Sequence, residues 1–210
     1  MRSLFRRTTA FSGLLVLTGI SPAFAHHVMG GALPQNAWQG FLSGLGHPII
    51  GLDHFAFIVG VGLMAQRSGR IALLPMVFVL GTLLGCWLHV AAFDLPWSEQ
   101  IIVLSLIAAA ALVAAQPRLP GFALAALFAA SGIFHGYAYG ESIVGAEPQP
   151  LLAYLTGFAL IQYCLALASG FGLQLIVRRD YIAESLALRL GAGAIGAIAV
   201  FTFINLMQVP

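Results

Sequence analysis

Six long apolar segments, separated by short polar connections, limit what this chain can fold into. They lie near residues 44–66, 71–92, 100–115, 121–139, 152–176 and 187–208. All but the third approach the roughly 20 residues that a helix needs to cross the hydrocarbon core of a membrane. Of the 210 residues 60% are hydrophobic and 8% are charged, whereas about a quarter of a soluble domain is charged. The sequence therefore predicts an all-α, polytopic membrane protein with six transmembrane helices.

The first 25 residues have the pattern of a secretory signal peptide. Several arginines precede an apolar run that is too short to span a bilayer core of about 30 Å. The small-x-small ending Ala23-Phe24-Ala25 predicts cleavage after Ala25. We therefore expect residues 1–25 to be removed and residues 26–210 to form a single transmembrane domain. An uncleaved first helix is the alternative.

The arginines predict how this domain is oriented. In a six-helix arrangement, those of residues 26–210 all fall on one side: Arg67, Arg70, Arg118, Arg178, Arg179 and Arg189. Arginine marks the cytoplasmic side of the cell membrane, so the mature N-terminus is expected on the periplasmic or outer side. The outer connections carry acidic residues and no arginine: Asp94, Glu99, Glu141 and Glu147. An acidic outer face attracts cations.

Two histidines and a carboxylate interrupt the first apolar segment. His47 and His54 are seven residues apart, which on one straight helix is two turns, about 10 Å, and nearly the same face. Asp53 lies beside His54, and a carboxylate in a membrane segment is costly and usually faces a pathway or a partner. Imidazole together with carboxylate suits a divalent ion such as Ni²⁺, Co²⁺, Zn²⁺ or Cu²⁺.

The remaining histidines lie in the same outer half of the predicted topology. His89 is near the outer end of its segment, and His135 is near the outer end of another, followed by Glu141. A structural histidine, hydrogen-bonded between helices, is the alternative for each, above all for His89.

Signal cleavage would expose the amine of His26 beside the amide and imidazole of His27. Such a tetragonal nitrogen set favours Ni²⁺ or Cu²⁺ and accepts Co²⁺; the alternative is a solvated terminus.

Two motifs resemble those of a known family. The run His47-Pro48-x-x-Gly51-x-Asp53-His54 resembles the HPxxGxDH signature of the HupE/UreJ family of hydrogenase and urease accessory proteins. The run FHGYAYGE, residues 134–141, resembles that family's His-Gly-x-Ala-His-Gly-x-Glu signature, with Tyr139 in place of its second histidine. The resemblance covers the whole chain and implies a nickel or cobalt permease. It implies a metal path formed by His47, Asp53, His54, His135 and Glu141.

A shorter resemblance concerns the expected mature N-terminus. The run HHVMGGALP, residues 26–34, is similar to the start of the membrane substrate-binding subunit of energy-coupling-factor cobalt and nickel transporters. In that subunit the terminal amine and the second-position histidine bind the metal, which here implies His26 and His27. The sequence carries no nucleotide-binding motif, so an ATP-driven step would require partner proteins.

These patterns predict a permease or channel, not an enzyme, that imports Ni²⁺ or Co²⁺ through a path open to the outer face. The metal ion is its transported substrate, and no catalytic cofactor is expected. The expected partners are the metal cation and the lipid bilayer; a homo-oligomer is left open, and a net charge of only +2 gives no reason to expect nucleic acid. One alternative is an intramembrane zinc-dependent hydrolase assisted by Ser43, Ser131 or Glu141. The other is a non-transporting metal sensor or assembly factor.

Overall fold

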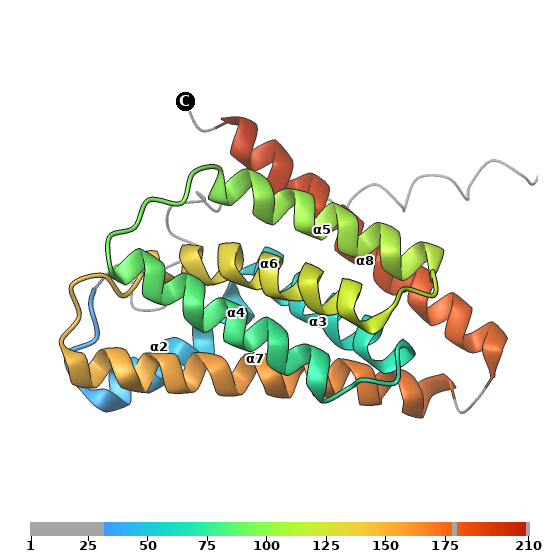
Figure 1. The fold of residues 1–210 in the computed structure, drawn as a ribbon, viewed down its shortest axis with the longest axis horizontal. Coiled ribbons are helices and arrows are strands. Elements are labelled where there is room, and N and C mark those ends of the chain that lie inside the picture. The colour runs from blue at the N-terminus through green and yellow to red at the C-terminus, as the bar shows by residue number, and fades with distance from the viewer. Residues whose placement is uncertain (1–31, 178–179, 209–210) are drawn as a thin grey trace, which may run out of the picture.

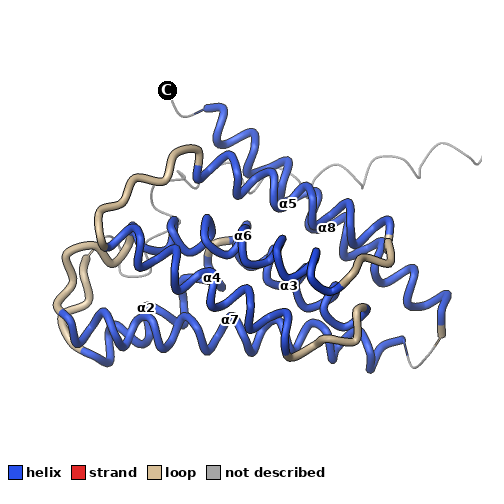
Figure 2. Tube along the Cα trace, in the orientation of Figure 1, coloured by secondary structure: helices blue, strands red, loops and turns tan. Residues whose placement is uncertain are grey.

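The computed structural model describes residues 32–177 and 180–208, and the regular structure within them is helical (Figure 2). The helices run in the order shown in Figure 1: α2 (Ala37–Ile50), α3 (Leu52–Arg67), α4 (Leu73–Val90), α5 (Ser98–Ala115), α6 (Gly121–Glu141), α7 (Pro148–Val177) and α8 (Tyr181–Gln208). The predicted all-α fold is confirmed for this part of the chain. The expected signal peptide and the chelating pair His26 and His27 lie outside the described residues.

Five helices, α4 to α8, are long and apolar enough to cross a membrane. The helices α2 and α3 qualify only as a pair, and their axes are bent by 79° relative to each other. Counted as one broken span, this pair completes the six predicted spans. The α5 helix has 18 residues, more than its predicted segment, and α7 has 30. The chain is therefore a multi-pass membrane protein.

The first span differs from the single helix expected over residues 44–66. Gly51 separates α2 from α3 and has extended backbone angles, φ −70° and ψ 100°. Pro48 lies just before this break and has no N–H with which to continue the helical hydrogen bonds. Hydropathy does not report the break, because the residues on both sides are apolar. His47 therefore lies in the last turn of α2, and not at the start of the first helix as predicted.

Glycines allow the helices of the bundle to pack closely. A Cβ atom on Gly136 of α6 would overlap the carbonyl oxygen of Thr82 in α4. A Cβ atom on Gly44 of α2 would likewise overlap the carbonyl oxygen of Tyr154 in α7. Such backbone contacts are typical of helix packing in lipid. They hold α6 close to α4, and α7 close to α2, the first half of the broken span.

The helix connections divide between the two ends of the bundle. Connections 91–97 and 142–147 lie at one end in Figure 1, and connections 68–72 and 116–120 lie at the other. Three arginines line one pocket at this second end: Arg67, Arg70 and Arg118. For these three arginines, the predicted separation from the acidic connections is seen in the arrangement of the helices. Which end faces the cytoplasm stays a prediction.

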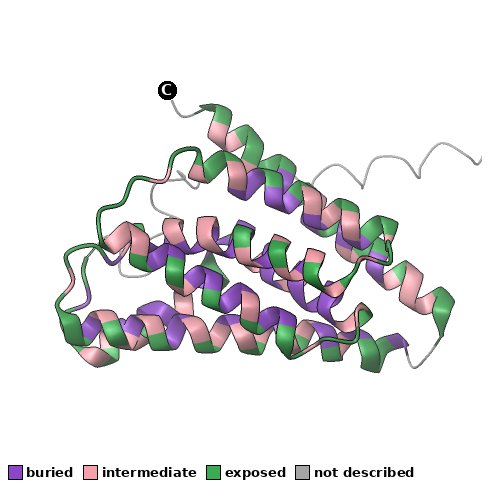
Figure 3. Cartoon of the chain, in the orientation of Figure 1, coloured by how far each residue is buried: buried purple, intermediate pink, exposed green. Residues whose placement is uncertain are grey.

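The outer surface of the bundle is rich in apolar side chains. Figure 3 shows buried positions on the helix faces that look inward and exposed positions on the outer faces. Leu175 and Ile176 of α7 are 74% and 73% exposed, and Leu190 of α8 is 67% exposed. Such exposure suits helices whose solvent is the lipid hydrocarbon, since apolar side chains cost nothing there.

Candidate functional site

Several helices bring imidazole and phenol rings together beside the break at Gly51. His47 lies in the last turn of α2 and His54 lies in the first turn of α3, and each is only 1% exposed. Their ring centres are 6.2 Å apart. Tyr139 of α6 packs against both rings, with its ring centre 4.9 Å from that of His47 and 4.2 Å from that of His54. We refer to these residues and their buried partners as the central cluster: His47, Asp53, His54, His135, Tyr139 and Tyr154.

A chain of hydrogen bonds orients His54. The Ser105 hydroxyl donates to the Ile102 carbonyl oxygen at 2.7 Å, so its oxygen accepts from Nε2–H of His135 at 2.9 Å. Nδ1 of His135 then accepts from Nδ1–H of His54 at 2.8 Å. The neutral tautomers assigned from these contacts place a nitrogen lone pair on Nε2 of His54. A histidine that donates one ring N–H and presents the other nitrogen is oriented as metal ligands are.

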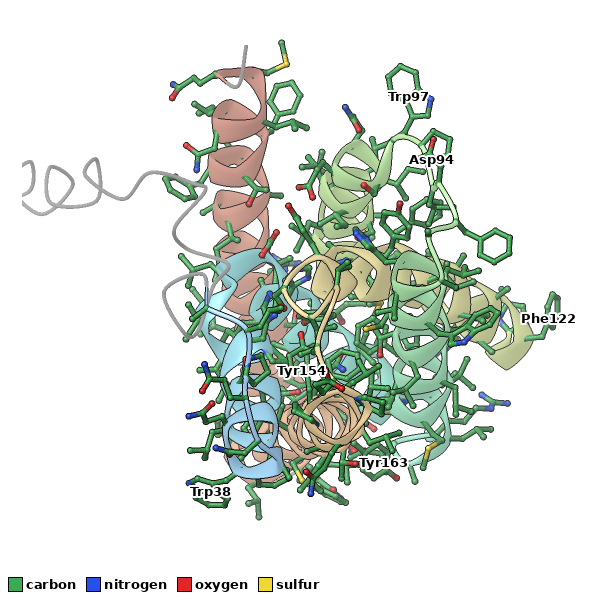
Figure 4. The ribbon with its side chains drawn as sticks, turned by 90° about the vertical axis from the view of Figure 1, so that its left-hand side faces the viewer. Trp38, Asp94, Trp97, Phe122, Tyr154 and Tyr163 are labelled. Carbon is green, nitrogen blue, oxygen red and sulfur yellow. The ribbon has the colours of Figure 1, made fainter. Side chains whose placement is uncertain are left out.

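A second set of hydrogen bonds orients His47. Its Nδ1 lies 2.8 Å from the Tyr154 hydroxyl and 3.1 Å from the Ser142 hydroxyl. Both hydroxyls donate to the carbonyl oxygen of Tyr139 at 3.1 Å, so both accept from Nδ1–H of His47. That carbonyl lies in the last turn of α6, where the helix itself offers no donor. Neutral His47 therefore also carries its lone pair on Nε2. Tyr154 is fully buried and lies near the middle of the molecule in Figure 4.

Asp53 adds a carboxylate next to the helix break, directly before His54 in the chain. The residue is 7% exposed. Its Oδ1 accepts the backbone N–H of His54 at 2.8 Å, within the first turn of α3. The positive end of the helix dipole favours a carboxylate at this position. Non-helical backbone at membrane depth is tolerated only where it is buried in protein or lines a cavity, and transporters use such breaks for ion sites.

The separation of His47 and His54 suits one shared ion. A divalent ion binds imidazole nitrogen at about 2.0–2.1 Å, so two such bonds plus the two ring radii match the 6.2 Å between the rings only if the two nitrogens lie on nearly opposite sides of the ion. The predicted separation of two turns along one straight helix is wrong, because the break at Gly51 turns the two residues toward each other. Within residues 32–177 and 180–208, no three His, Cys, Asp or Glu side chains are grouped closely enough to hold a metal ion. Binding an ion here therefore requires side chains to move.

His135 is buried in the interior of the bundle, within two turns of the end of α6 at which it was predicted to lie. It is fully buried, six residues before the end of α6, and its ring stacks on Phe57 at 4.5 Å. Both ring nitrogens are used, one by His54 and the other by Ser105. Since the Ser105 hydroxyl hydrogen is directed to a backbone carbonyl, the pair lacks the serine-to-histidine donation of a hydrolase. His135 is thus placed to position His54.

Two predicted ligands lie outside the central cluster. His89 is in the last turn of α4, and its ring packs on Tyr137 with ring centres 4.3 Å apart. It lines an open pocket of about 290 Å³ together with Asp94, and its Nδ1 has no hydrogen-bond partner among the described residues. Glu141 is exposed at the end of α6. The predicted ligands therefore divide into a buried group and two residues nearer the outer connections.

Tyr139 lies at the centre of the cluster, where the resemblance implies a histidine. It is fully buried, and among the described residues its hydroxyl has no hydrogen-bond partner. A side chain at this position touches both His47 and His54. The replacement of histidine by tyrosine therefore changes the chemistry between the two imidazoles and not at a remote position.

Three residues of the site were not predicted from the sequence: Ser105, Ser142 and Tyr154. Each provides a hydroxyl that fixes a histidine tautomer. Ser105 is a single hydroxyl within an apolar helix, and Ser142 directly follows the second motif. These are weak signals, because isolated serine and tyrosine residues are common in membrane helices and pair locally with the backbone.

Comparisons with known proteins assign the chain to a family. The family described as HupE / UreJ protein matches residues 14–202. Protein HupE of Rhizobium leguminosarum bv. viciae is 31% identical over 122 residues, or 57% of this chain, and the match spans 61% of that protein's length. No solved structure matches the chain. Because the family match extends over most of the sequence, the chain belongs to the HupE/UreJ family.

Proposed function

We propose that this protein is a membrane permease that imports Ni²⁺ or Co²⁺ through the central cluster. The observation that carries this proposal is the broken first span, where two oriented imidazoles and a buried carboxylate meet at Gly51. Imidazole nitrogen suits borderline divalent ions such as nickel and cobalt, and the carboxylate offsets their charge. The family resemblance implies the same two metals.

The path begins at the acidic outer end of the bundle. The acidic connections raise the local concentration of cations, and the pocket with His89 and Asp94 offers an imidazole and a carboxylate to an arriving ion. His26 and His27, if exposed by signal cleavage, provide a second capture site there. From the outer end the ion passes to His47 and His54. A membrane potential of 100 mV, negative inside, favours entry of a divalent cation by about 4.6 kcal/mol.

The residues of the cluster have different tasks in this path. His47 and His54 bind the ion through Nε2, and Asp53 neutralises part of its charge. Tyr154 holds the tautomer of His47, as His135 holds that of His54. Partners that orient metal ligands in this way affect metal affinity without touching the ion.

Asp53→Asn tests the proposal while preserving the helix end. An asparagine Oδ1 accepts the same backbone N–H as Asp53, so the variant keeps this hydrogen bond in the first turn of α3 and loses only the charge. We expect initial uptake of Ni²⁺ and Co²⁺ at submicromolar concentration to fall by roughly tenfold or more, because the ion loses its buried counter-charge. Competition between the two ions in the same assay reports which is preferred.

Asp180→Asn is the matched control. Asp180 also accepts backbone N–H groups at a helix start, those of Ile182 and Ala183, but it lies at the opposite end of the bundle. This variant is expected to import both metals like the parent. If Asp53→Asn is inserted normally and imports them at the parent rate, the central cluster is not the metal path.

A further inference from the structure

A pocket of about 270 Å³ lies at the arginine-bearing end of the bundle, where α3 and α5 end. Residues of α3, α5, α6 and α8 and the connections between them line it. Its rim is basic, with three arginines: Arg67, Arg70 and Arg118. Its floor is apolar and includes the buried side chains of Leu63, Val113, Leu124 and Leu188. Neither the metal path nor the family motifs use these residues.

Two of the three rim arginines have no carboxylate partner among the described residues. Arg67 pairs with Glu184 of α8, and this is the one ion pair among the described residues. Arg70 and Arg118 therefore have no carboxylate partner there. The Arg70 guanidinium packs directly against Gly121, where a Cβ atom would overlap it. Since Gly121 is the first residue of α6, the positive end of that helix dipole lies next to the arginine.

We propose that this pocket binds an anionic phospholipid, with its phosphate between Arg70 and Arg118 and the start of an acyl chain on the apolar floor. Arginine presents a planar set of donors that matches phosphate oxygens. A basic pocket between transmembrane helices on the arginine-rich side of a membrane protein faces the leaflet where anionic headgroups are recognised. A free phosphate ion can bind the arginines of the rim but has no group that contacts the apolar floor. A phospholipid binds both, so the apolar floor favours the lipid over free phosphate.

The first test compares lipids and phosphate on the purified full-length protein. Phosphatidylglycerol is expected to raise the midpoint of thermal unfolding in detergent, whereas phosphatidylcholine and inorganic phosphate leave it unchanged. A double variant, Arg70→Gln with Arg118→Gln, should weaken phosphatidylglycerol binding roughly 25-fold, about fivefold for each arginine near an anionic headgroup. Arg189→Gln, on the same side of the predicted topology but outside the pocket, is the control and should bind like the parent.

Three results would overturn the proposal. The first is that phosphatidylglycerol does not shift the unfolding midpoint of the parent, the second is that inorganic phosphate at millimolar concentration reproduces the shift, and the third is that the double variant binds phosphatidylglycerol as tightly as the parent. A second measurement needs no variant. A phosphatidylglycerol carrying a photoreactive group in its acyl chain is expected to cross-link to peptides of residues 63–70 and 112–124 in the unmodified protein, and cross-links confined to other segments would contradict the assignment.

Discussion

The hydroxyl of Tyr154 is expected to control metal affinity without contacting the metal. It accepts from Nδ1–H of His47 at 2.8 Å and donates to the carbonyl oxygen of Tyr139 at 3.1 Å. Tyr154→Phe removes both hydrogen bonds and keeps the ring that packs against Phe158. Loss of a partner that orients a metal-binding histidine typically costs about 10- to 100-fold in metal affinity.

The size of the affinity loss in Tyr154→Phe depends on the neighbouring Ser142. Its hydroxyl lies 3.1 Å from Nδ1 of His47 and also donates to the Tyr139 carbonyl oxygen. In Tyr154→Phe, therefore, Ser142 still holds the tautomer, and we expect about a tenfold loss, equivalent to about 1.4 kcal/mol. Tyr154→Phe combined with Ser142→Ala removes both partners and should approach about a 100-fold loss.

Initial uptake rates over a range of Ni²⁺ concentrations provide the assay. The half-saturating concentration should rise, and the maximal rate should change little, because the imidazole itself remains. Tyr163→Phe is the control, since the Tyr163 hydroxyl donates to the Ala72 carbonyl oxygen in an exposed place on the same helix. If the double variant and Tyr163→Phe both have the half-saturating Ni²⁺ concentration of the parent, the orientation of His47 has no effect on metal binding and the reasoning is refuted.

Three further variants test other parts of the structure. Tyr139→His should alter the preference between Ni²⁺ and Co²⁺ in competition assays; identical behaviour of Tyr139→His, Tyr139→Phe and the parent would mean that the position only packs. Gly136→Ala forces a Cβ into the Thr82 carbonyl oxygen and should lower stability in detergent by about 1–3 kcal/mol, whereas Gly172→Ala, with nothing within 4 Å, should not. The N-terminal site requires a mature chain that starts at His26, which mass spectrometry can establish. Inserting Ala-Gly-Gly before His26 should then weaken metal uptake at low metal concentration and leave uptake at saturating concentration unchanged. Unchanged uptake at low concentration would exclude the terminus as a ligand.

The features that the sequence predicted correctly depend on local or averaged properties. Apolar length predicted the all-α membrane fold. The grouping of Arg67, Arg70 and Arg118 follows from the alternation of connections between the two ends of the bundle. Each of these depends on composition or on the period of a helix, which a single sequence records directly.

The features that the sequence did not predict depend on one backbone torsion and on hydrogen-bond partners that lie far away in the chain. The helix break at Gly51 changes the geometry of His47 and His54, but hydropathy averages over it. The hydroxyls that set the histidine tautomers come from helices far away in sequence, as with Tyr154, which is 107 residues from His47. The place of His89 outside the cluster likewise depends on how α4 packs, which no motif encodes.

Metal flux into liposomes that contain only the purified protein tests the central proposal most directly. With a membrane potential negative inside and no ATP, we predict that the parent protein admits Ni²⁺ or Co²⁺ into the lumen faster than protein-free liposomes do. The Asp53→Asn protein should lose most of this flux, and Asp180→Asn should keep it. Flux no greater than in protein-free liposomes, from protein that is folded and correctly inserted, would contradict the proposal that this chain alone forms a metal path.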